Sequence, residues 1–334
     1  MRVPAPAKIN LHLRVGPARS DGFHPLLTWM VTVGLFDTLT LVRQRDQPAG
    51  VSSDDGFERD WFKLATNHLG LPVDEGNLVV RAANALADTL SRNREGPTAG
   101  REGVSAFLNK NVPSGAGLGG GSSDAAATLI GLNRLWKLNW PMDRLAGIAA
   151  RLGSDIPFFF HGPSSICTGR GEIVRPIPAP MPKWAVLVLP NIEMPTPAVY
   201  RRFDEMKLGE TKLEEKKPEE IQFGEMNLGG EQFLSREPDW LQWVKRPARE
   251  LLEELVNDLE PPSFAIRPEL GRLRSDLERE LGRIVRMSGS GSSLFTLCDE
   301  AAEAERLAGR ASQMFKVDAK AVQLAPTIGL GDDG

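Results

Sequence analysis

A run of small residues near the middle of the chain has the composition of a phosphate-binding loop. It comprises Pro113, Ser114, Gly115, Ala116, Gly117, Leu118, Gly119, Gly120, Gly121, Ser122 and Ser123. Glycines let backbone N–H groups point inward without Cβ clashes, and a following helix adds unpaired donors and the positive end of its dipole. A helical pattern begins next, near Asp124. The run is therefore interpreted as a cradle for phosphate, in preference to a flexible loop ended by a serine cap.

The spacing within this loop narrows the class of phosphate site. A Walker loop requires Gly-Lys-Ser or Gly-Lys-Thr at its end, and no lysine follows these glycines. Gly115, Gly117 and Gly120 do fit the G-x-G-x-x-G pattern of dinucleotide-binding domains. Such a domain also needs an acidic residue about 20 positions later, at the tip of a strand. That position falls near residues 141–143, where a helix is expected to start, so a nicotinamide-dependent oxidoreductase is the weaker alternative.

Hydrophobic periodicity and helix-breaking residues predict the elements that position this loop. In the first half of the chain, strands are expected at 8–15 and at 30–42, the second interrupted by a turn at Phe36 and Asp37. Helices are expected from Asn77 to Leu90, from Ala125 to Trp136, and from Pro141 to Gly153.

The second half of the chain begins with a change in composition. The prolines between Pro176 and Pro182 place a domain boundary slightly upstream of themselves. Residues 207–239, rich in Glu, Lys and Gly, predict a solvated insertion that is flexible or only partly helical. The remaining pattern predicts a strand at 184–189, helices at 251–259 and 270–281, a strand–turn–strand at 284–297 and a helix at 300–315.

Composition limits the classes of function. The chain has 334 residues, of which 41% are hydrophobic and 25% charged, and this length suits two domains with real cores. Its formal net charge of -4 argues against a nucleic-acid partner. Neither a signal-peptide core nor a run of about 20 apolar residues is found, so we expect a cytoplasmic protein with no membrane partner.

The metal-ligating residue types are sparse and scattered. Cys167 and Cys298 have no second cysteine or histidine at metal-ligand spacing and are expected to be reduced, partly buried thiols. The four histidines lie far apart in the sequence. A metal site built by the protein alone is therefore not expected.

Four motifs, taken in order, resemble those of the GHMP kinase superfamily. They are residues 6–10 (Pro-Ala-Lys-Ile-Asn), the glycine-rich loop, residues 152–157 (Leu-Gly-Ser-Asp-Ile-Pro) and residues 288–292 (Ser-Gly-Ser-Gly-Ser). The resemblance implies an α+β protein of two domains with the active site between them. It implies a ribosomal protein S5 domain 2-like ATP-binding domain at 1–170, a ferredoxin-like substrate-binding domain at 171–324 that contains the charged insertion, and a tail at 325–334.

The same resemblance implies a catalytic pair. By itself, Asp155 would be interpreted as a turn carboxylate, and Lys8 as an exposed lysine on a strand. In the family, the matching aspartate accepts the proton of the attacking hydroxyl, and such base catalysis contributes on the order of 10²–10⁴-fold. The matching lysine lies beside it and offsets charge that develops on the transferring phosphoryl group.

For the co-substrate ATP, the resemblance implies that residues 113–123 wrap the phosphates. The hydroxyls of Ser122 or Ser123 would lie close to Mg²⁺. The adenine pocket would include Asn77 and Lys110, although Asn77 can equally be a plain helix cap. The turn at 288–293 would brace the phosphate loop, or form an ordinary hairpin turn.

Further residues resemble one branch of the family, whose substrate is a cytidine-diphosphate-linked methylerythritol phosphorylated on its 2-hydroxyl in the non-mevalonate synthesis of isoprenoid precursors. They are the longer glycine loop, residues 21–24 (Asp-Gly-Phe-His) and residues 195–200 (Pro-Thr-Pro-Ala-Val-Tyr). This implies that His24 hydrogen-bonds the base edge, while Phe23 and Tyr200 stack on the base at about 1–3 kcal/mol per base. Asn10 and Thr196 would contact the erythritol or phosphate portions.

The sequence departs from this branch at one position and leaves other readings open. Relatives often have tyrosine where this chain has Phe23, so a contact of the phenol oxygen is lost. A homoserine or mevalonate-type kinase of the same family would have no base for Phe23, His24 and Tyr200 to hold. A non-catalytic nucleotide-binding relative would not need both Lys8 and Asp155. The oligomeric state is expected to be a monomer or a weak homodimer.

Overall fold

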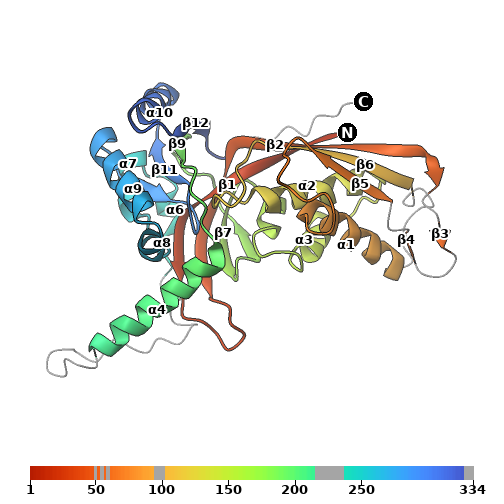
Figure 1. The fold of residues 1–334 in the computed structure, drawn as a ribbon, viewed down its shortest axis with the longest axis horizontal. Coiled ribbons are helices and arrows are strands. Elements are labelled where there is room, and N and C mark those ends of the chain that lie inside the picture. Colours follow the sequence, from red (N-terminus) through yellow and green to blue (C-terminus); the bar gives the residue numbers. More distant parts are fainter. Residues whose placement is uncertain (49–50, 53–55, 58–60, 94–101, 215–236, 327–334) are drawn as a thin grey trace.

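The computed structural model describes residues 1–48, 51–52, 56–57, 61–93, 102–214 and 237–326. It forms an elongated molecule of two domains, with the first two strands running through both (Figure 1). The strands are β1 (Arg2–Val15), β2 (Leu26–Pro48), β3 (Val51–Ser52), β4 (Gly56–Phe57), β5 (Phe62–Thr66), β6 (Glu102–Asn109), β7 (Ser164–Gly169), β8 (Ile173–Pro176), β9 (Trp184–Leu189), β10 (Arg286–Met287), β11 (Leu294–Cys298) and β12 (Asp318–Gln323).

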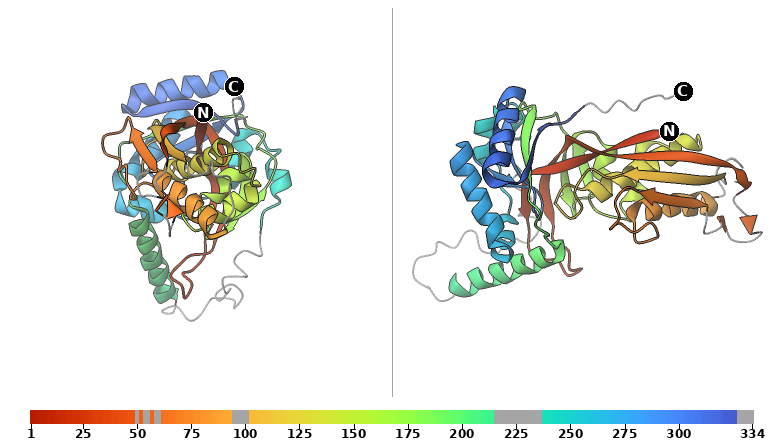
Figure 2. Two further views of the ribbon diagram at one scale, coloured as in Figure 1. Left: turned by 90° about the vertical axis from the view of Figure 1, so that its right-hand side faces the viewer. Right: turned by 45° about the horizontal axis from the view of Figure 1, so that its top comes forward.

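The helices fall into two groups, one in each domain (Figure 2). They are α1 (Leu78–Asn93), α2 (Gly120–Leu135), α3 (Met142–Ala149), the 3-10 helix η2 (Pro157–Phe160), α4 (Thr196–Glu214), α6 (Trp240–Trp243), α7 (Ala248–Glu254), α8 (Glu260–Ile266), α9 (Pro268–Leu281) and α10 (Ala301–Phe315). None of the described helices combines the length and the apolar composition needed to cross a membrane.

Strand β1 is longer than its pattern predicts, because it includes the proline-containing residues before Lys8. It begins at Arg2 and pairs with β2 along its whole length, from Arg2 opposite Thr40 to Val15 opposite Leu26. Its prolines, Pro4 and Pro6, lack the N–H that a second neighbouring strand would require, and an edge position tolerates them.

The turn expected at Phe36 and Asp37 is wrong. Strand β2 is continuous there, and the irregularity is a bulge just before these residues: Pro6 pairs with Phe36, whereas Ala7 pairs with Val33. The bulge bends the strand without ending it.

The N-terminal domain is a sheet covered on one face by helices. The strand order is β5-β6-β2-β7-β8, with β1 paired to β2. Helices α1, α2 and α3 pack on this sheet (Figure 1), and their buried residues form one core with side chains of β1, β2 and β6. The stripe expected after Asn77 is the buried face of α1.

The C-terminal domain has the ferredoxin-like topology that was expected. Its antiparallel sheet has the order β10-β11-β9-β12. Along the chain, β9 is followed by helices, then by β10 and β11, then by α10 and β12, which is the βαββαβ arrangement of that fold. Strand β12 was not predicted from the sequence.

The two domains share a core, because the strands common to both pack against the second sheet. Alternate residues of β9, Ala185 and Leu187, face Ile9 of β1 and Trp29 of β2 in one cluster of buried side chains. The other face of β9, with Val186, packs against α9 and α10. Lys8 lies on β1 next to this junction.

The expected domain boundary at residue 171 falls within a hairpin of the first sheet. Strand β8, Ile173–Pro176, pairs with β7 and belongs to the six-stranded sheet. The chain therefore passes from the first sheet to the second between Pro176 and Trp184. The prolines that suggested a boundary lie in this connection, after the hairpin.

The expected insertion at 207–239 is in part the end of a helix. Helix α4 continues to Glu214 and projects from the body of the domain (Figure 1). Residues 215–236 lie outside the described part of the chain, as do residues 327–334 of the expected tail. The helix expected at 251–259 ends earlier, since α7 stops at Glu254 and α8 begins at Glu260.

Candidate active site

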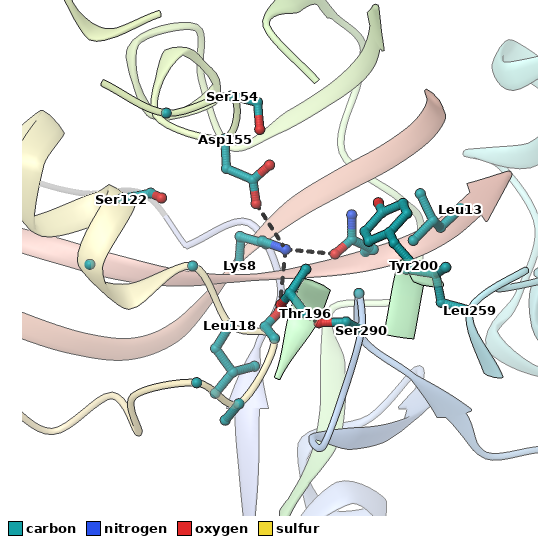
Figure 3. A pocket seen from close by; sticks show the side chains of 18 of the residues that line it. Lys8, Leu13, Leu118, Ser122, Ser154, Asp155, Thr196, Tyr200, Leu259 and Ser290 are labelled. Atoms are coloured by element: carbon teal, nitrogen blue, oxygen red, sulfur yellow. Dashed lines mark hydrogen bonds and ion pairs between the residues drawn. The ribbon is translucent and has the colours of Figure 1, made fainter. Parts of the chain in front are cut away.

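A cavity of about 900 Å³ lies where the two domains meet. Its lining comes from β1, the glycine-rich loop, the loop before η2, the β7–β8 turn, the start of α4 and the turn between β10 and β11. Figure 3 shows Ser122, Asp155 and Tyr200 arranged around Lys8 in this cavity. Segments from both domains therefore build one site.

Lys8 and Asp155, which are distant in sequence, meet at the centre of the cavity. The Lys8 ammonium is buried and lies 3.4 Å from Asp155 Oδ2. It donates hydrogen bonds to Asn10 Oδ1 at 2.6 Å and to the Gly117 carbonyl at 3.2 Å (Figure 3). An ammonium has three donors, and these three contacts match that number. The Asp155 side chain is 32% exposed and can be reached by a substrate from the cavity.

The glycine-rich loop is fixed against β1 and against the turn of residues 288–293. The Lys8 N–H donates to the Leu118 carbonyl at 2.9 Å, which ties the loop to the strand. The Ser288 hydroxyl donates to the Gly117 carbonyl at 3.0 Å and accepts from the Asn10 N–H at 3.1 Å. A Cβ on Gly117 would overlap the Ser288 carbonyl oxygen. The contact between this turn and the loop lies where it was predicted.

Positive φ angles give the loop its shape. Gly115, Gly117 and Gly119 have φ of 68°, 77° and 67°, a region that side chains disfavour. Helix α2 starts directly afterwards, at Gly120. All residues from Pro113 to Ser122 line the cavity, so the loop and the start of α2 border the same space.

Ser122 and Ser123 have different positions. Ser122 lines the cavity, whereas Ser123 is buried outside the lining. Among the described residues, the Ser123 hydroxyl has no hydrogen-bond partner. Of the two serines named in the prediction, Ser122 is the one that the cavity can reach.

Asn77 and Lys110 lie outside the lining of the cavity, and their side chains have structural partners. Asn77 caps α1, because its Oδ1 accepts the Val79 N–H at 3.0 Å. The Lys110 ammonium lies 2.8 Å from Asp124 Oδ2 and also pairs with Asp37. The roles of Asn77 and Lys110 in an adenine pocket stay predictions.

The cluster of Lys110, Asp37 and Asp124 was not predicted. Asp37 Oδ1 accepts the N–H groups of Asn111 and Val112, so it holds the chain that leads into the glycine-rich loop. Burial raises the pKa of Asp124 to about 7, against the opposing effect of the Lys110 charge. A buried aspartate within a strand is the one local signal that could have revealed the cluster.

The other end of the cavity holds the residues expected to bind a base. His24 Nδ1 donates to the Gly16 carbonyl at 2.9 Å, and Nε2 lies 3.5 Å from Asp204 Oδ2. The Tyr200 ring is centred 5.1 Å from the His24 ring. Burial, with a smaller effect of the Asp155 charge, raises the pKa of Tyr200, which keeps its phenol neutral. Phe23 is 49% exposed at this end.

The two remaining candidates are held by protein groups. Asn10 accepts from Lys8 with Oδ1, and its Nδ2 donates to the Thr28 hydroxyl at 2.8 Å. Thr196 is bonded through its hydroxyl to the Ser290 hydroxyl at 2.8 Å. Both residues line the cavity, and their contacts with a substrate stay predictions.

Sequence reasoning missed two cationic side chains of the lining, Arg170 and Arg201. Arg170 lies between Gly169 and Gly171 directly after β7, and a cation flanked by two glycines after a strand could have been noticed. The described residues contain no group of three or more His, Cys, Asp or Glu that could hold a metal ion. Both cysteines are buried and free.

A glycine-rich loop at a helix start faces a buried lysine that pairs with a partly exposed aspartate, between an α+β domain and a ferredoxin-like domain, and this arrangement is typical of an ATP-dependent small-molecule kinase. The comparison with protein families agrees. Residues 77–163 match the GHMP kinases N terminal domain, and residues 241–317 match the GHMP kinases C terminal domain. The chain belongs to the GHMP kinase family.

Curated relatives extend over nearly the whole chain. A protein of Nocardioides sp. is 37% identical over 91% of this chain and 90% of its own length. A protein of Geobacillus sp. is 35% identical over 94% of this chain and 95% of its own length. Both are named 4-diphosphocytidyl-2-C-methyl-D-erythritol kinase.

Solved structures give the same result at the level of the fold. A crystal structure of 4-(cytidine 5'-diphospho)-2C-methyl-D-erythritol kinase, 32% identical, matches with a TM-score of 0.68 over 98% of this chain and 100% of that chain. A homoserine kinase from Cytophaga hutchinsonii, 15% identical, matches with a TM-score of 0.63 over 97% of this chain and 94% of that chain. The second likeness shows a shared fold alone.

Proposed function

We propose that this kinase transfers the γ-phosphoryl group of ATP to the 2-hydroxyl of 4-diphosphocytidyl-2-C-methyl-D-erythritol, a step in the non-mevalonate synthesis of isoprenoid precursors. The observation that carries the proposal is the pair formed by Lys8 Nζ and Asp155 Oδ2, 3.4 Å apart, in one cavity with His24 and Tyr200. The names of relatives up to 37% identical support this substrate. Cytoplasmic location and a monomer or weak homodimer belong to the same proposal.

The proposal gives each part of the site one role. The loop at 113–122 holds the phosphates of ATP with its backbone N–H groups. Asp155 accepts the proton of the substrate's 2-hydroxyl. At the same time the hydroxyl oxygen bonds to the γ-phosphorus, and the bond between that phosphorus and the β,γ-bridging oxygen breaks. The Lys8 charge stabilises the negative charge on the oxygens around the phosphorus, and ADP leaves.

Mg²⁺ fits the donor set of the site. This ion binds oxygen ligands, keeps several waters and uses substrate phosphates in place of a complete cage of protein ligands. The lining offers the Ser122 hydroxyl, at the start of α2, as a protein ligand. When bound, the ion neutralises charge on the phosphates of ATP.

At the nucleoside end, the chain supplies aromatic faces and a fixed imidazole. The Gly16 carbonyl can only accept, so the hydrogen of His24 lies on Nδ1 and the ring orientation is set. Phe23 and Tyr200 provide aromatic surface for stacking, worth about 1–3 kcal/mol per base. A homoserine or mevalonate-type substrate would leave these three side chains without a ligand.

The direct test is a product assay. Purified protein with ATP, Mg²⁺ and the cytidyl substrate should release ADP and a product heavier by one phosphoryl group, measured by mass spectrometry. Homoserine and mevalonate in parallel reactions should remain unchanged. Phosphorylation of either one in place of the cytidyl substrate would overturn the substrate, and turnover of none would favour a non-catalytic relative.

The catalytic pair has its own test. Asp155→Asn should lower kcat on the order of 10²–10⁴-fold, because a neutral amide does not accept the hydroxyl proton. ATP binding, measured by calorimetry, should persist. Asp143→Asn is the matched control, since that carboxylate lies on α3 with its side chain 89% exposed. Near-normal kcat in Asp155→Asn would reject the role of this residue.

A further inference from the structure

The β7–β8 turn connects the two ends of the cavity. At one end, a Cβ added to Gly171 would lie 3.5 Å from Asp155 Oδ1, so the backbone of the turn lies against the proposed catalytic base. At the other end, the Arg170 guanidinium carbon lies 4.8 Å from the centre of the Phe23 ring. Arg170 therefore extends from the site of phosphoryl transfer toward the nucleoside end.

The backbone of the β7–β8 turn fixes the position of the Arg170 Cα, from which its side chain extends. Gly169 and Gly171 have φ of 71° and 117°, a backbone that only glycine adopts readily. The Arg170 N–H donates to Glu172 Oε2 at 2.6 Å, and Arg170 Nε lies 3.6 Å from Glu172 Oε1. Within the described residues, this pair with Glu172 is the one ion pair of Arg170, and its guanidinium donates no side-chain hydrogen bond. The side chain is 39% exposed and lines the cavity, so the guanidinium remains available for an anion.

The charges of the lining single out Arg170. Its cations in the described residues are Lys8, Arg170 and Arg201. Lys8 already contacts Asp155, Asn10 and the glycine-rich loop at the transfer end, which is the end of the cavity where phosphoryl transfer is proposed. Arg201 is exposed on α4. Only Arg170 joins the two ends, and a guanidinium can bind a phosphate through two parallel hydrogen bonds.

We infer that Arg170 binds the diphosphate that links the nucleoside to the polyol of the second substrate, and that the same guanidinium holds the Phe23 ring in its stacking position. The inference rests on the proposed function. A substrate with its hydroxyl at Asp155 and its base at His24 has its diphosphate between them, beside Arg170. The cation–π contact leaves the guanidinium edge, with its N–H donors, free to face the phosphates.

The first test is a comparison of kinetic constants. Arg170→Met should raise the KM for the cytidyl substrate about 10–100-fold, as expected when charge-assisted hydrogen bonds to a phosphate are lost. The KM for ATP and kcat should change by less than about threefold. Arg170→Lys should fall between, because it keeps the charge and loses the paired geometry.

Arg175→Met is the matched control. Arg175 lies on β8 of the same hairpin, pairs with Glu237 and does not line the cavity, so its loss should leave every constant unchanged. A folded Arg170→Met variant with the wild-type KM for the cytidyl substrate would overturn the inference while leaving the proposed function intact.

A second measurement separates the diphosphate from the base. With the ATP site saturated by a non-hydrolysable ATP analogue, CDP should bind the wild-type protein at least tenfold more tightly than cytidine. Arg170→Met should abolish most of this difference. If the wild type does not phosphorylate the cytidyl substrate, the proposed function fails, and this binding ratio alone decides the role of Arg170. An equal CDP preference in both proteins would refute it.

Discussion

The two ends of the cavity are built in opposite ways. At the transfer end, Lys8 is buried, and the glycine-rich loop is bonded to β1 and to Ser288 from the other domain. At the nucleoside end, Phe23 is 49% exposed, and Arg170 and Tyr200 come from separate elements as single side chains. The transfer end is formed by backbone that hydrogen bonds hold in place, whereas the nucleoside end is formed by individual side chains.

This difference shows which part of the site tolerates change. A phosphate cradle made of backbone N–H groups depends on φ angles and close approach, so nearly every position in it is constrained. A stacking face depends on an aromatic ring, and phenylalanine supplies that as well as tyrosine does. The family resemblance leads one to expect tyrosine at the position of Phe23, and an exchange between these two rings falls at the more tolerant end. Substitutions at each end can test this contrast.

The largest effect is expected at Gly117. Gly117→Ala should destabilise the protein by about 2–5 kcal/mol, because positive φ adds strain and the Cβ overlaps the Ser288 carbonyl. Gly115→Ala is the matched control, with φ of 68° and no atom within 4 Å of an added Cβ. It should cost about 1–2 kcal/mol from strain alone. Urea unfolding measures the free energy of unfolding of both variants. Equal decreases in the two variants would contradict the close contact between Gly117 and the Ser288 carbonyl.

A smaller effect is expected at Phe23. Phe23→Ala should raise the KM for the cytidyl substrate by about 5–150-fold, equivalent to the loss of about 1–3 kcal/mol of stacking. Phe23→Tyr should stay within about threefold of wild type, since the ring is kept. Phe107→Ala, at a 44% exposed phenylalanine outside the cavity lining, serves as the control for steady-state kinetics. A large defect in Phe23→Tyr would show that this end is not tolerant.

The smallest effect concerns pH and the cluster behind the loop. Burial raises the pKa of Asp124 from 3.8 to about 7, so the folded protein holds this proton more tightly than the unfolded chain does. The stability it contributes is complete below the unfolded pKa and is lost as pH rises to about 7. Asp124→Asn should remove this loss, so its free energy of unfolding should fall less than that of wild type between about pH 5 and about pH 8.

Chemical denaturation at the two pH values checks this dependence. Asp88→Asn, at an exposed carboxylate on α1, should keep the wild-type slope. Parallel slopes in wild type and Asp124→Asn would mean that the cluster does not retain the proton.

Local sequence patterns predicted those helices and strands whose hydrophobic periodicity is clear. The apolar stripe after Asn77 and the run at 184–189 became α1 and β9. The turn at Phe36 was wrong because β2 stays paired with β1 across a bulge, and the predicted boundary at residue 171 falls inside the β7–β8 hairpin. Strand β12 alternates polar and apolar residues, but its apolar residues at 319 and 321 are only alanines, and its pairing with β9 is what identifies it.

In the candidate site, too, local patterns predicted some features and long-range contacts decided others. The glycine-rich loop was evident from its composition, whereas the meeting of Lys8 with Asp155 was implied by the family motifs and by no local pattern. The Asp37–Lys110 contact depends on a register that sets Thr38 of β2 opposite Asn109 of β6, which single-sequence patterns do not contain. The glycines beside Arg170 could have drawn attention to it, but its position between Phe23 and Asp155 is visible only in the structure.

The ribbon of β1 and β2 has a mechanical consequence. Because this ribbon contributes side chains to the cores of both domains, the domains cannot swing about a flexible linker without bending a hydrogen-bonded sheet. Lys8 therefore keeps its place relative to both halves when ligands enter and leave. Any gating of the cavity falls to elements outside the ribbon, such as the projecting α4 that carries Thr196 and Tyr200.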